Sequence, residues 1–297
     1  MGYYDTYYRA VVQRTSRLSP SLVRVVLGAG DLGRWTSSGT ADERLVLVFP
    51  RPGEREAPAP ERLPDGTQDY PDAGPQPEMR SYTVRSFDPA RAEMAVDFVA
   101  HEGGVAAQWA LDARPGDALQ VTEAAGWYTP PPGCTWQLLV ADLTGLPALG
   151  RIVENLPAGT RAHVVAEVID PGDRLEPSSA AEVTYTWLPG CGNGVAPSAL
   201  PRAVRDLVWP EGPGYVWFAG EAAASRAVRK HLRHERGCAV ADYRVLGYWR
   251  ARQEEWMQRY EQVGAGLEAV YTDAVASGVN STDALELYDD ALERVGL

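Results

Sequence analysis

The first third of the chain alternates short runs rich in Val, Tyr and Phe with turn-forming residues. Residues 91–99 read RAEMAVDFV, an alternation of polar and apolar positions that is typical of a half-buried strand. Breakers such as LSPS and RPGDA separate the runs. The pattern predicts a small closed antiparallel barrel of six strands, at Tyr7–Thr15, Leu22–Leu27, Leu45–Phe49, Arg80–Phe87, Glu93–Val99 and Ala118–Glu123.

Two segments interrupt this β pattern. Pro50–Met79 contains eight prolines, which excludes a helix or a central strand. We interpret it as either a mobile surface excursion or a flap over a ligand site. Val105–Leu111 reads VAAQWAL and predicts one helix, which ends before Arg114-Pro115-Gly116.

Beyond Pro130–Gly133 the pattern changes to strands that alternate with helices. The predicted strands are Trp136–Ala141, Arg161–Ile169, Glu182–Trp187, Tyr215–Ala219 and Tyr243–Tyr248. The predicted helices are Leu146–Leu156, Ser198–Leu207 and Ala222–Arg236. Such alternation indicates a Rossmann-like parallel sheet with helices on both faces, and ligands of such sheets bind beyond the carboxyl ends of the strands.

The C-terminal part departs from this alternation. Apolar residues recur every three or four positions over Gln253–Ala276, which predicts an amphipathic helix that Gly264 and Gly266 would divide. A second helix starts at Ser281. We interpret this part as packed helices, with a partner surface as the alternative. The predicted organisation is a barrel domain at 1–129, an α/β domain at 134–250 and a helical extension at 251–297.

Composition and charge restrict the class of protein. The 297 residues are 45% hydrophobic and 23% charged, as in globular proteins. No apolar run is long enough to span a membrane, and no secretion signal opens the chain, so we expect a cytoplasmic protein. The net charge of −12 argues against a nucleic-acid partner. Lys230 is the single lysine, so arginines must supply any anion site.

Cysteine and histidine spacing predicts no metal site. The three cysteines form no CxxC pair, which fits a reducing compartment. The four histidines lack ligand spacing, and we expect His231 and His234 to be solvated.

The sequence Arg80-Ser81-Tyr82-Thr83 carries the strongest chemical signal. A guanidinium can pair with phosphate, a tyrosine ring can stack on an isoalloxazine, and a threonine hydroxyl can hydrogen-bond the flavin ring. Together these groups suit a flavin, although the same residues also fit an ordinary edge strand.

A strand that ends in Asp97-Phe98-Val99-Ala100-His101 leads into Gly103-Gly104 and the helix at 105. A helix start after glycines offers amides and a favourable dipole to a pyrophosphate. Trp109 fills the core or touches the flavin.

In the α/β domain, the first strand is followed by Asp142-Leu143-Thr144-Gly145, where Thr144 can cap the next helix and face a nicotinamide nucleotide. No GxGxxG fingerprint occurs. Glu221, at another helix start, either contacts the nucleotide or complements the helix dipole.

RSYTVRSFDP, followed by VDFVAHEGGVAAQWA, resembles the siderophore-interacting protein family, the FAD-dependent ferric-siderophore reductases of the ferredoxin–NADP reductase superfamily. LVADLTGLPALGRIVENLPAGTRAHVVAEV, YVWFAGEAAASRAVRKHLRHERG and VLGYWR resemble later segments of the family. The resemblance spans roughly residues 5–250, with the motifs in the family's order.

The resemblance implies an FAD-binding barrel and an NAD(P)H-binding domain. By position, FAD would be bound by Arg80, Ser81, Tyr82, Thr83, Asp97, Phe98, Val99, Ala100, His101, Val105, Ala106 and Ala107. Tyr82 and Thr83 would also be the catalytic residues, and Asp142, Thr144, Glu221, Tyr248 and Trp249 would contact the nicotinamide coenzyme or the flavin.

The implied function is a reductase that passes electrons from NADH or NADPH through FAD to Fe(III) in a siderophore or another ferric chelate. Arg85, Arg250 and Arg252 are candidate contacts to a negatively charged chelate. The chain departs from the family pattern at Leu143, Val105 and Glu123–Gly126. Alternatives are a biosynthetic flavoenzyme or flavin reductase, and a flavin or siderophore binder without turnover. The sequence does not predict an oligomeric state.

Overall fold

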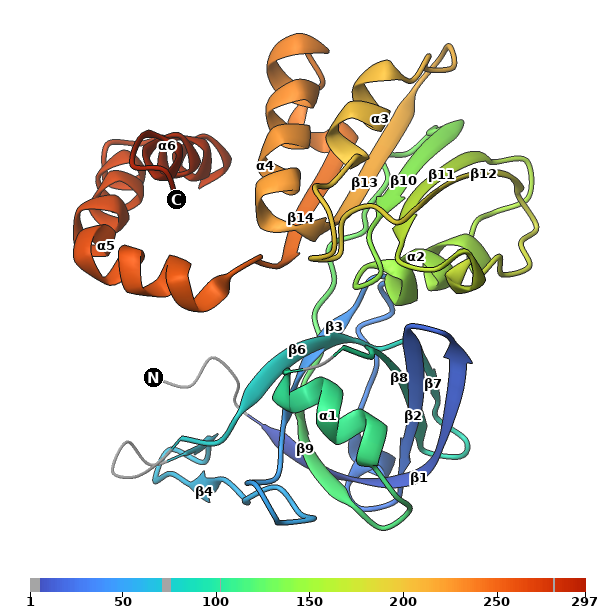
Figure 1. The fold of residues 1–297 in the computed structure, drawn as a ribbon, viewed down its shortest axis with the longest axis vertical. Coiled ribbons are helices and arrows are strands. Elements are labelled where there is room, and N and C mark those ends of the chain that lie inside the picture. Colours follow the sequence, from blue (N-terminus) through green and yellow to red (C-terminus); the bar gives the residue numbers. More distant parts are fainter. Residues whose placement is uncertain (1–5, 71–75, 102, 280) are drawn as a thin grey trace.

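The structure is a computed structural model that describes residues 6–70, 76–101, 103–279 and 281–297. It contains a seven-stranded antiparallel sheet, a five-stranded parallel sheet and a C-terminal pair of helices. In Figure 1 the antiparallel sheet is curled into a barrel below the parallel sheet. The predicted fold class is therefore confirmed, although the strand count of the barrel differs.

The barrel sheet has the order β6-β3-β9-β1-β2-β8-β7. Its strands are β1 (Tyr7–Ser19), β2 (Leu22–Gly28), β3 (Arg44–Val48), β6 (Met79–Thr83), β7 (Ser86–Asp88), β8 (Glu93–Val99) and β9 (Ala118–Thr122).

The prediction of one strand over Arg80–Phe87 is wrong. β6 pairs with β3 and β7 pairs with β8, so the chain must leave one partner to reach the other. The barrel therefore has seven strands rather than six.

The link Val84–Arg85 joins the two outermost strands of this sheet. The amide of Val84 donates to the Glu43 carbonyl at 3.0 Å, and the amide of Arg85 donates to the Ala95 carbonyl at 2.9 Å. Because β6 and β7 lie at opposite ends of the strand order, a two-residue link between them curls the sheet into a barrel.

Apolar side chains from alternate strand positions fill the barrel. On β8, Met94, Val96 and Phe98 are fully buried, as the alternation at 91–99 predicts. Helix α1 (Val105–Asp112) packs Ala106 and Ala110 on the same core.

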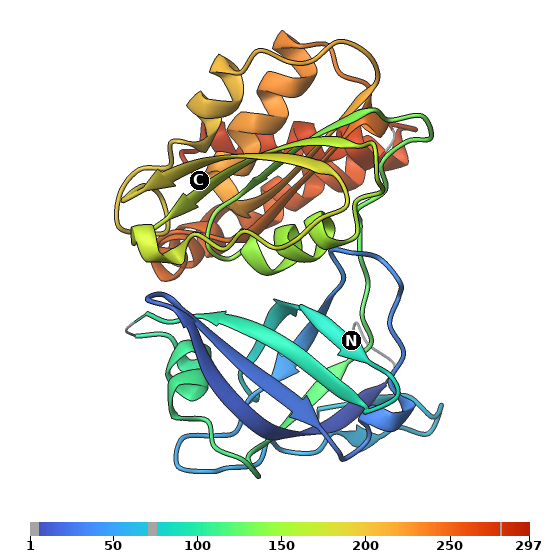
Figure 2. The same cartoon turned by 90° about the vertical axis from the view of Figure 1, so that its right-hand side faces the viewer.

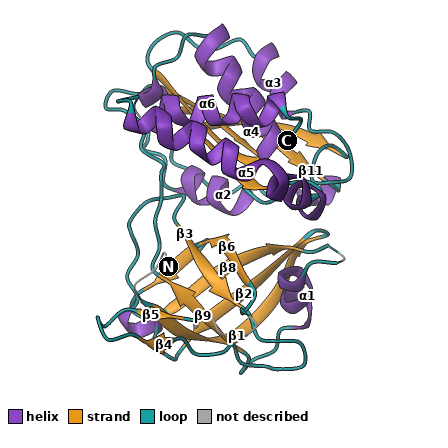
Figure 3. Cartoon of the chain, turned by 90° about the vertical axis from the view of Figure 1, so that its left-hand side faces the viewer, coloured by secondary structure: helices purple, strands orange, loops and turns teal. Residues whose placement is uncertain are grey.

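The proline-rich segment forms no long element. It contains β4 (Glu61–Arg62) and β5 (Gln68–Asp69), which pair with each other. Figure 3 places this hairpin at the end of the barrel away from the parallel sheet. The described part of the segment therefore fits a surface excursion better than a flap between the sheets. Residues 71–75 lie outside the described residues, as do residues 1–5, on which the expectation about secretion depends.

The parallel sheet has the order β12-β11-β10-β13-β14. Its strands are β10 (Trp136–Ala141), β11 (Arg161–Val168), β12 (Glu182–Pro189), β13 (Gly214–Glu221) and β14 (Tyr243–Trp249). Helix α2 (Leu146–Glu154) covers one face, and α3 (Leu200–Asp206) and α4 (Ala222–Lys230) cover the other. Short helical turns occur at Leu32–Arg34, Pro171–Asp173, His231–Glu235 and Val240–Asp242.

The expectation that His231 is solvated is wrong. The residue is only 4% exposed and begins the π-helical turn that follows α4. The ring Nδ1 lies 2.8 Å from a Glu235 carboxylate oxygen.

Hydrogen bonds and ion pairs join the barrel to the parallel sheet. The Trp217 indole donates to Asp42 at 3.0 Å, and Arg151 on α2 pairs with buried Glu43 at 2.8 Å. The Ser19 hydroxyl donates to Asp173 at 2.6 Å. Figure 2 shows α2 on the side of the upper sheet that faces the barrel. The contact of Asp173 with Ser19 thus brings the segment that follows β11 to the domain junction.

The C-terminal helices α5 (Gln253–Ala276) and α6 (Ser281–Arg294) form a hairpin beside α4 (Figure 1). α5 runs through Gly264 and Gly266 without a break, so the predicted division is wrong. Trp256, Tyr260 and Val270 on α5 pack on a small core that includes Leu292. This packing outweighs the low helix propensity of two glycines.

The domain limits at residues 129, 134 and 250 stay a prediction. No described helix combines the length and the apolar character that a bilayer crossing requires.

Candidate functional site

Strand β6 presents the arginine–tyrosine–threonine motif at the edge of the barrel. The Tyr82 ring lies on the barrel core, with its centroid 4.4 Å from that of Phe98 and 6.3 Å from that of Phe49. Burial raises the pKa of Tyr82, so its hydroxyl stays protonated at neutral pH. Trp109 packs edge-on against Phe49 at 5.5 Å, which agrees with the core interpretation of Trp109.

Arg80 and Ser81 are exposed, in contrast to the two residues that follow them. The Arg80 guanidinium pairs with Glu78 and donates to the Met79 carbonyl at 2.8 Å. A phosphate that binds Arg80 must therefore replace or share the ion pair with Glu78. Among the described residues, no other predicted site residue makes a hydrogen bond or ion pair with this guanidinium.

Two buried hydroxyls from different domains interact with each other but make no hydrogen bond of ordinary geometry within the described residues. Thr83 Oγ1 and the Tyr248 hydroxyl are both inaccessible to water, and neither makes a hydrogen bond of ordinary geometry within the described residues. Burial, and then the nearby Asp42 charge, raise the pKa of Tyr248, and a hydrogen-bonding interaction with the Thr83 hydroxyl opposes this effect. Buried polar groups are normally paired, so this pair indicates a place for a polar ligand atom.

The end of β8 supplies backbone and a buried carboxylate. Asp97 is 6% exposed and accepts two hydrogen bonds from Arg24, at 2.7 and 2.8 Å. Phe98 points into the barrel, Val99 lies half-buried at the end of the strand, and the Ala100 amide donates to the Ser21 carbonyl at 2.8 Å. Both carboxylate oxygens of Asp97 therefore already accept hydrogen bonds from Arg24 on β2.

His101 lies over the start of α1. A Cβ atom at Gly104 would lie 2.5 Å from the His101 ring, so this close approach requires glycine at the N-cap. The first-turn amides of Val105, Ala106 and Ala107 precede any helical acceptor. Val105 is 51% exposed, whereas the two alanine side chains are buried. This helix start has the geometry that binds phosphate.

Asp142 organises the carboxyl end of β10. One carboxylate oxygen accepts the amide and hydroxyl of Thr144, at 2.9 and 2.6 Å, and the other accepts the Trp249 indole at 2.6 Å. Burial raises the pKa of Asp142, and these hydrogen bonds oppose that effect. The expectation that Thr144 caps α2 is wrong, because its hydroxyl bonds to Asp142 and Gly145 is the N-cap.

A glycine-rich loop after β12 completes this edge, and the sequence analysis missed it. The Asn193 side chain accepts the Leu143 amide at 2.9 Å, and Gly194 lies next to the Trp249 ring. Leu143 itself is fully buried. The GCGNG run at 190–194, with left-handed backbone at Asn193, was the available signal.

Glu221 caps its own helix. One carboxylate oxygen accepts the amides of Ala223 and Ala224, at 2.6 and 3.1 Å, and the other accepts the Ala251 amide at 3.3 Å. These bonds agree with the interpretation of Glu221 as an acid that complements the helix dipole.

The three arginines predicted to meet a chelate are already engaged. Arg85 pairs with Glu154 on α2 at 2.5 and 2.8 Å, and Arg250 stacks on the Trp256 ring at 3.9 Å. Arg252 lies 3.6 Å from Glu255. Sequence reasoning missed Arg24, whose signal was a charged residue within the apolar run of β2.

These groups fit an FAD molecule. The buried hydroxyls of Thr83 and Tyr248 can meet polar ring atoms, Tyr82 offers an aromatic ring, and the start of α1 can hold a pyrophosphate. No group of three or more His, Cys, Asp or Glu side chains with metal-binding geometry occurs in the described ranges.

A closed antiparallel barrel followed by a five-stranded parallel sheet defines the ferredoxin-reductase-like fold. A ferredoxin NADP+ reductase structure from Neisseria gonorrhoeae has this fold, with a TM-score of 0.53, 11% identity, and coverage of 82% of this chain and 99% of that chain. Residues 11–127 match the siderophore-interacting FAD-binding domain, and residues 134–252 match the siderophore-interacting protein model. The chain belongs to the siderophore-interacting protein family, as predicted.

Two relatives support this membership. The crystal structure of a siderophore utilization protein from T. fusca is 34% identical, with a TM-score of 0.72, and the match covers 82% of this chain and 93% of that one. An NADPH-dependent ferric-chelate reductase from Escherichia coli is 30% identical, and the match covers 81% of this chain and 92% of the relative.

Proposed function

We propose that this chain is an FAD-dependent oxidoreductase that passes electrons from NAD(P)H to Fe(III) in a siderophore or another ferric chelate. The carrying observation is the pair of buried hydroxyls of Thr83 and Tyr248, which come from different domains, lie close to each other and make no hydrogen bond of ordinary geometry with the described residues. A flavin ring edge between the domains would satisfy both hydroxyls. The relative from Escherichia coli is named for the same reaction with NADPH, which supports the proposal.

The proposed roles of the side chains follow from their positions. Arg80 and the amides at 105–107 hold the pyrophosphate, and the Tyr82 ring lies against the isoalloxazine. Thr83 donates or accepts a hydrogen bond at the ring, and Tyr248 and Trp249 exclude water from the side of the second domain. Bound FAD would supply two-electron acceptance and one-electron release.

The substrate step needs little from the protein beyond position. Hard oxygen ligands hold Fe(III) tightly, and reduction to Fe(II) weakens that hold. One NAD(P)H carries two electrons, so two ferric chelates are reduced for each coenzyme oxidised. Arg85 and Arg250 must exchange their present contacts if either binds the chelate.

The proposed domain limits follow the changes of architecture. Residues 1–129 form the FAD-binding domain, 134–250 the NAD(P)H-binding domain and 251–297 the helical extension. The proline link at 130–133 and the end of β14 support these limits. Cys134, Cys191 and Cys238 are free thiols, which supports a cytoplasmic location.

Anaerobic titration tests the function. The FAD-loaded chain is mixed with NADPH or NADH, and bleaching of the flavin is followed before a ferric chelate and a ferrous indicator are added. Bleaching followed by Fe(II) release at a catalytic rate is expected. Thr83→Ala should slow turnover about tenfold or more, which corresponds to one lost hydrogen bond to the ring. Ser86→Ala, an exposed hydroxyl on the adjoining strand, should leave the rate unchanged.

Two other outcomes would replace this assignment. Bleaching with turnover of free flavin or quinones but not of ferric chelates would indicate a flavin reductase or a biosynthetic flavoenzyme. A flavin that neither coenzyme bleaches would indicate a binder without turnover.

A further inference from the structure

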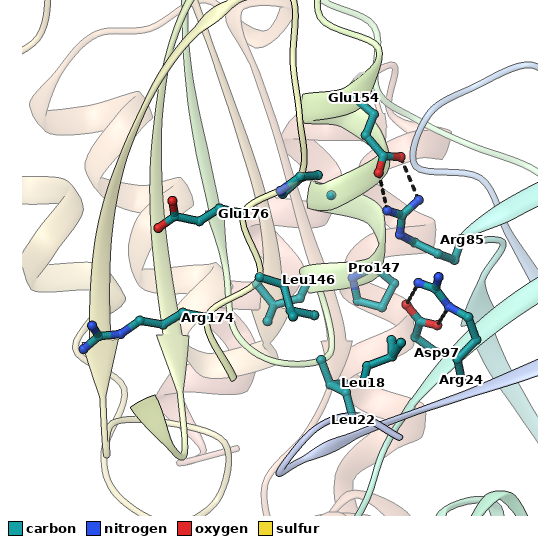
Figure 4. Close-up of a pocket in the computed structure, with 13 residues that line it drawn as sticks. Leu18, Leu22, Arg24, Arg85, Asp97, Leu146, Pro147, Glu154, Arg174 and Glu176 are labelled. Atoms are coloured by element: carbon teal, nitrogen blue, oxygen red, sulfur yellow. Dashed lines mark hydrogen bonds and ion pairs between the residues drawn. The ribbon is translucent and has the colours of Figure 1, made fainter. Parts of the chain in front are cut away.

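The α5–α6 hairpin lies outside both family models, neither of which extends past residue 252. It also takes no part in a cavity of about 330 Å³ between the barrel and α2, whose lining residues all precede residue 178. In that cavity, Arg24 and Arg85 are neutralised by Asp97 and Glu154 (Figure 4). The hairpin is therefore a separate part of the molecule, and the proposed reaction assigns it no role.

The hairpin is rich in exposed apolar side chains. Among the described residues, six of the twelve exposed large apolar side chains lie after residue 252. Three of them, Met257, Tyr271 and Val275, share one side of α5. Met257 and Val275 are about five helical turns apart, and Tyr271 is about one turn before Val275. Single apolar residues are normal on a protein surface, whereas an aligned row of them indicates a contact surface.

The other side of α5 is already covered. Trp256, Tyr260 and Leu267 pack with Leu292 of α6 in the small core of the hairpin. In Figure 1 the hairpin lies at the margin of the molecule beside α4, and α5 forms its outer edge. The apolar row of α5 therefore remains open to solvent in the part of the chain that the structure describes.

A row of glutamates runs beside the apolar row. Glu254, Glu261 and Glu268 are exposed and follow each other at intervals of seven residues, which keeps them on one side of the helix. Glu268 accepts the Tyr260 hydroxyl at 3.0 Å, whereas the side chains of Glu254 and Glu261 make no hydrogen bond or ion pair with the described residues. Residues 253–297 contain ten acidic and only two basic side chains, so the glutamate row belongs to a strongly negative surface.

The two rows restrict what can dock on α5. In paired helices the apolar rows bury each other, and the charged positions beside them select the partner. A second copy of this chain would bring two glutamate rows together, and repulsion between like charges disfavours that arrangement. A helix with lysine or arginine beside its apolar row would be attracted instead. The hairpin already holds one basic helix in this way, because α6 pairs with basic side chains of α4, Asp289 with Arg229 and Glu293 with Lys230.

We propose that α5 docks an amphipathic helix with basic side chains, supplied by another protein, on its two exposed rows. The apolar side of the partner helix covers Met257 and Val275, and its lysines or arginines pair with Glu254 and Glu261. Helix α5 then lies between the partner and α6. The inference is independent of the coenzyme and of the ferric chelate, because none of these residues belongs to the proposed flavin site.

Titration of the full chain with a designed helical peptide tests the proposal. The probe is a fluorescent peptide of leucine and lysine in a seven-residue amphipathic repeat, and its control is a peptide of the same composition in scrambled order. Fluorescence anisotropy should show binding of the amphipathic peptide that is tighter by about tenfold or more, because only this peptide presents an apolar row that can be buried. Binding should weaken as salt rises, since exposed charges are screened.

Two double variants separate the apolar row from the glutamate row. Met257→Ser with Val275→Ser should weaken binding of the amphipathic peptide by about tenfold or more. Glu254→Gln with Glu261→Gln should flatten the salt dependence of binding. Val208→Ser is the matched control, because Val208 is an exposed apolar residue outside the hairpin. Thermal unfolding of each variant separates loss of binding from loss of fold.

Equal binding of the two peptides would overturn the proposal, as would unchanged affinity in the Met257→Ser, Val275→Ser variant. Hydrogen exchange locates the bound peptide, and protection is expected over 253–276. Faster exchange over 281–294 in its place would show that the peptide displaces α4 from α6, which contradicts docking on α5. A concentration-dependent dimer of the unmodified chain that the same double variant abolishes would assign the apolar row to a second copy and refute the basic partner.

Discussion

At the residue scale, Asp142 shows how closely the site depends on individual atoms. Its carboxylate joins the start of α2 to the last residue of β14, across the intervening strand β13. The space for it exists because Gly220 on β13 has no side chain. A Cβ atom there would lie 2.9 Å from Asp142 Oδ2, which is closer than such contacts occur.

We therefore expect Gly220→Ala to destabilise the chain by about 1–3 kcal/mol, the usual cost of overpacking. The displaced carboxylate would also release the Trp249 indole, so the tryptophan emission should shift. Gly33→Ala is the control, because an added Cβ there meets nothing within 4 Å. Unfolding in urea measures the effect, and equal stability of the two variants would contradict this account.

Arg80 provides a second prediction at this scale. Because its guanidinium is exposed and held only by Glu78 and a neighbouring carbonyl, the arginine can turn toward a phosphate at little cost. Arg80→Ala should weaken FAD binding by about tenfold to a hundredfold, the value of one charge-assisted contact. Fluorescence titration of the flavin-free chain measures the affinity, with Arg62→Ala on the surface hairpin as control.

The residue types at the site could be predicted from the sequence, but their partners could not. The motif at 80–83 identifies a strand whose chemistry suits a flavin. Nothing local indicates that Thr144 bonds back to Asp142 rather than capping α2, or that Asn193, fifty residues later, accepts the Leu143 amide. These choices depend on where the sheet brings distant segments.

At the element scale, the α5–α6 hairpin is joined to the body mainly through charges. Arg229 on α4 pairs with Asp289 on α6, Lys230 lies 3.5 Å from Glu293, and Arg226 donates to the Leu297 carbonyl at 3.1 Å. The described apolar core of the hairpin contains no residue of α4.

Reversing one of these charges should therefore detach the hairpin. Arg229→Asp should cost about 1.5–3 kcal/mol at the contact, the range for a hydrogen bond between charged groups. Hydrogen exchange over 253–297 should accelerate accordingly. The double variant Arg229→Asp with Asp289→Arg should restore protection, and failure of the swap to do so would rule out a charge-based attachment.

The π-helical turn after α4 has a pH dependence that can be measured. Hydrogen bonds from Arg205 and then His231 lower the pKa of Glu235 to about 2. The stabilisation is present above the ordinary pKa of a glutamate and is lost as the pH falls through the value in the folded chain. The difference in melting temperature between the wild type and Glu235→Gln should shrink from pH 6 toward pH 2. Glu211→Gln, on a separate loop, should show no such trend.

The limits of a strand or helix could be predicted from the sequence where its hydrophobic pattern alone determines it. The strand at 136–141 has the predicted limits, whereas the predicted strand at 80–87 is two strands. The apolar positions Tyr82 and Val84 are two residues apart, but the next one is Phe87, and this shift of one residue is the signal that the prediction of a single strand overlooked. Likewise, the packing of Tyr260 across Gly264 explains a continuous helix that propensity alone disfavours.

At the scale of the whole molecule, the two domains meet through buried polar contacts. Asp173 is buried, which would raise its pKa, yet hydrogen bonds from Ser19, Asp170 and Ser21 outweigh this and lower it. Asp173→Asn should therefore loosen the junction. We expect faster hydrogen exchange at residues 17–24 and a lower unfolding temperature, whereas Asp206→Asn, at an exposed position of α3, should change neither. Unaltered exchange in the Asp173 variant would show that other contacts hold the domains.

The two-domain architecture itself follows from the change in periodicity near residue 130. The closed junction between the two domains could not be predicted from periodicity, because contacts such as that between Asp42 and Trp217 join residues 175 positions apart. No local pattern encodes such a pair.

The Val84–Arg85 link has one more consequence. A circularly permuted chain, opened between these two residues and joined at the two ends of the given sequence, would lose the direct covalent link between β6 and β7, the outermost strands of the described barrel sheet. The sheet could then open between β6 and β7, even though every strand would keep its hydrogen-bonded neighbours.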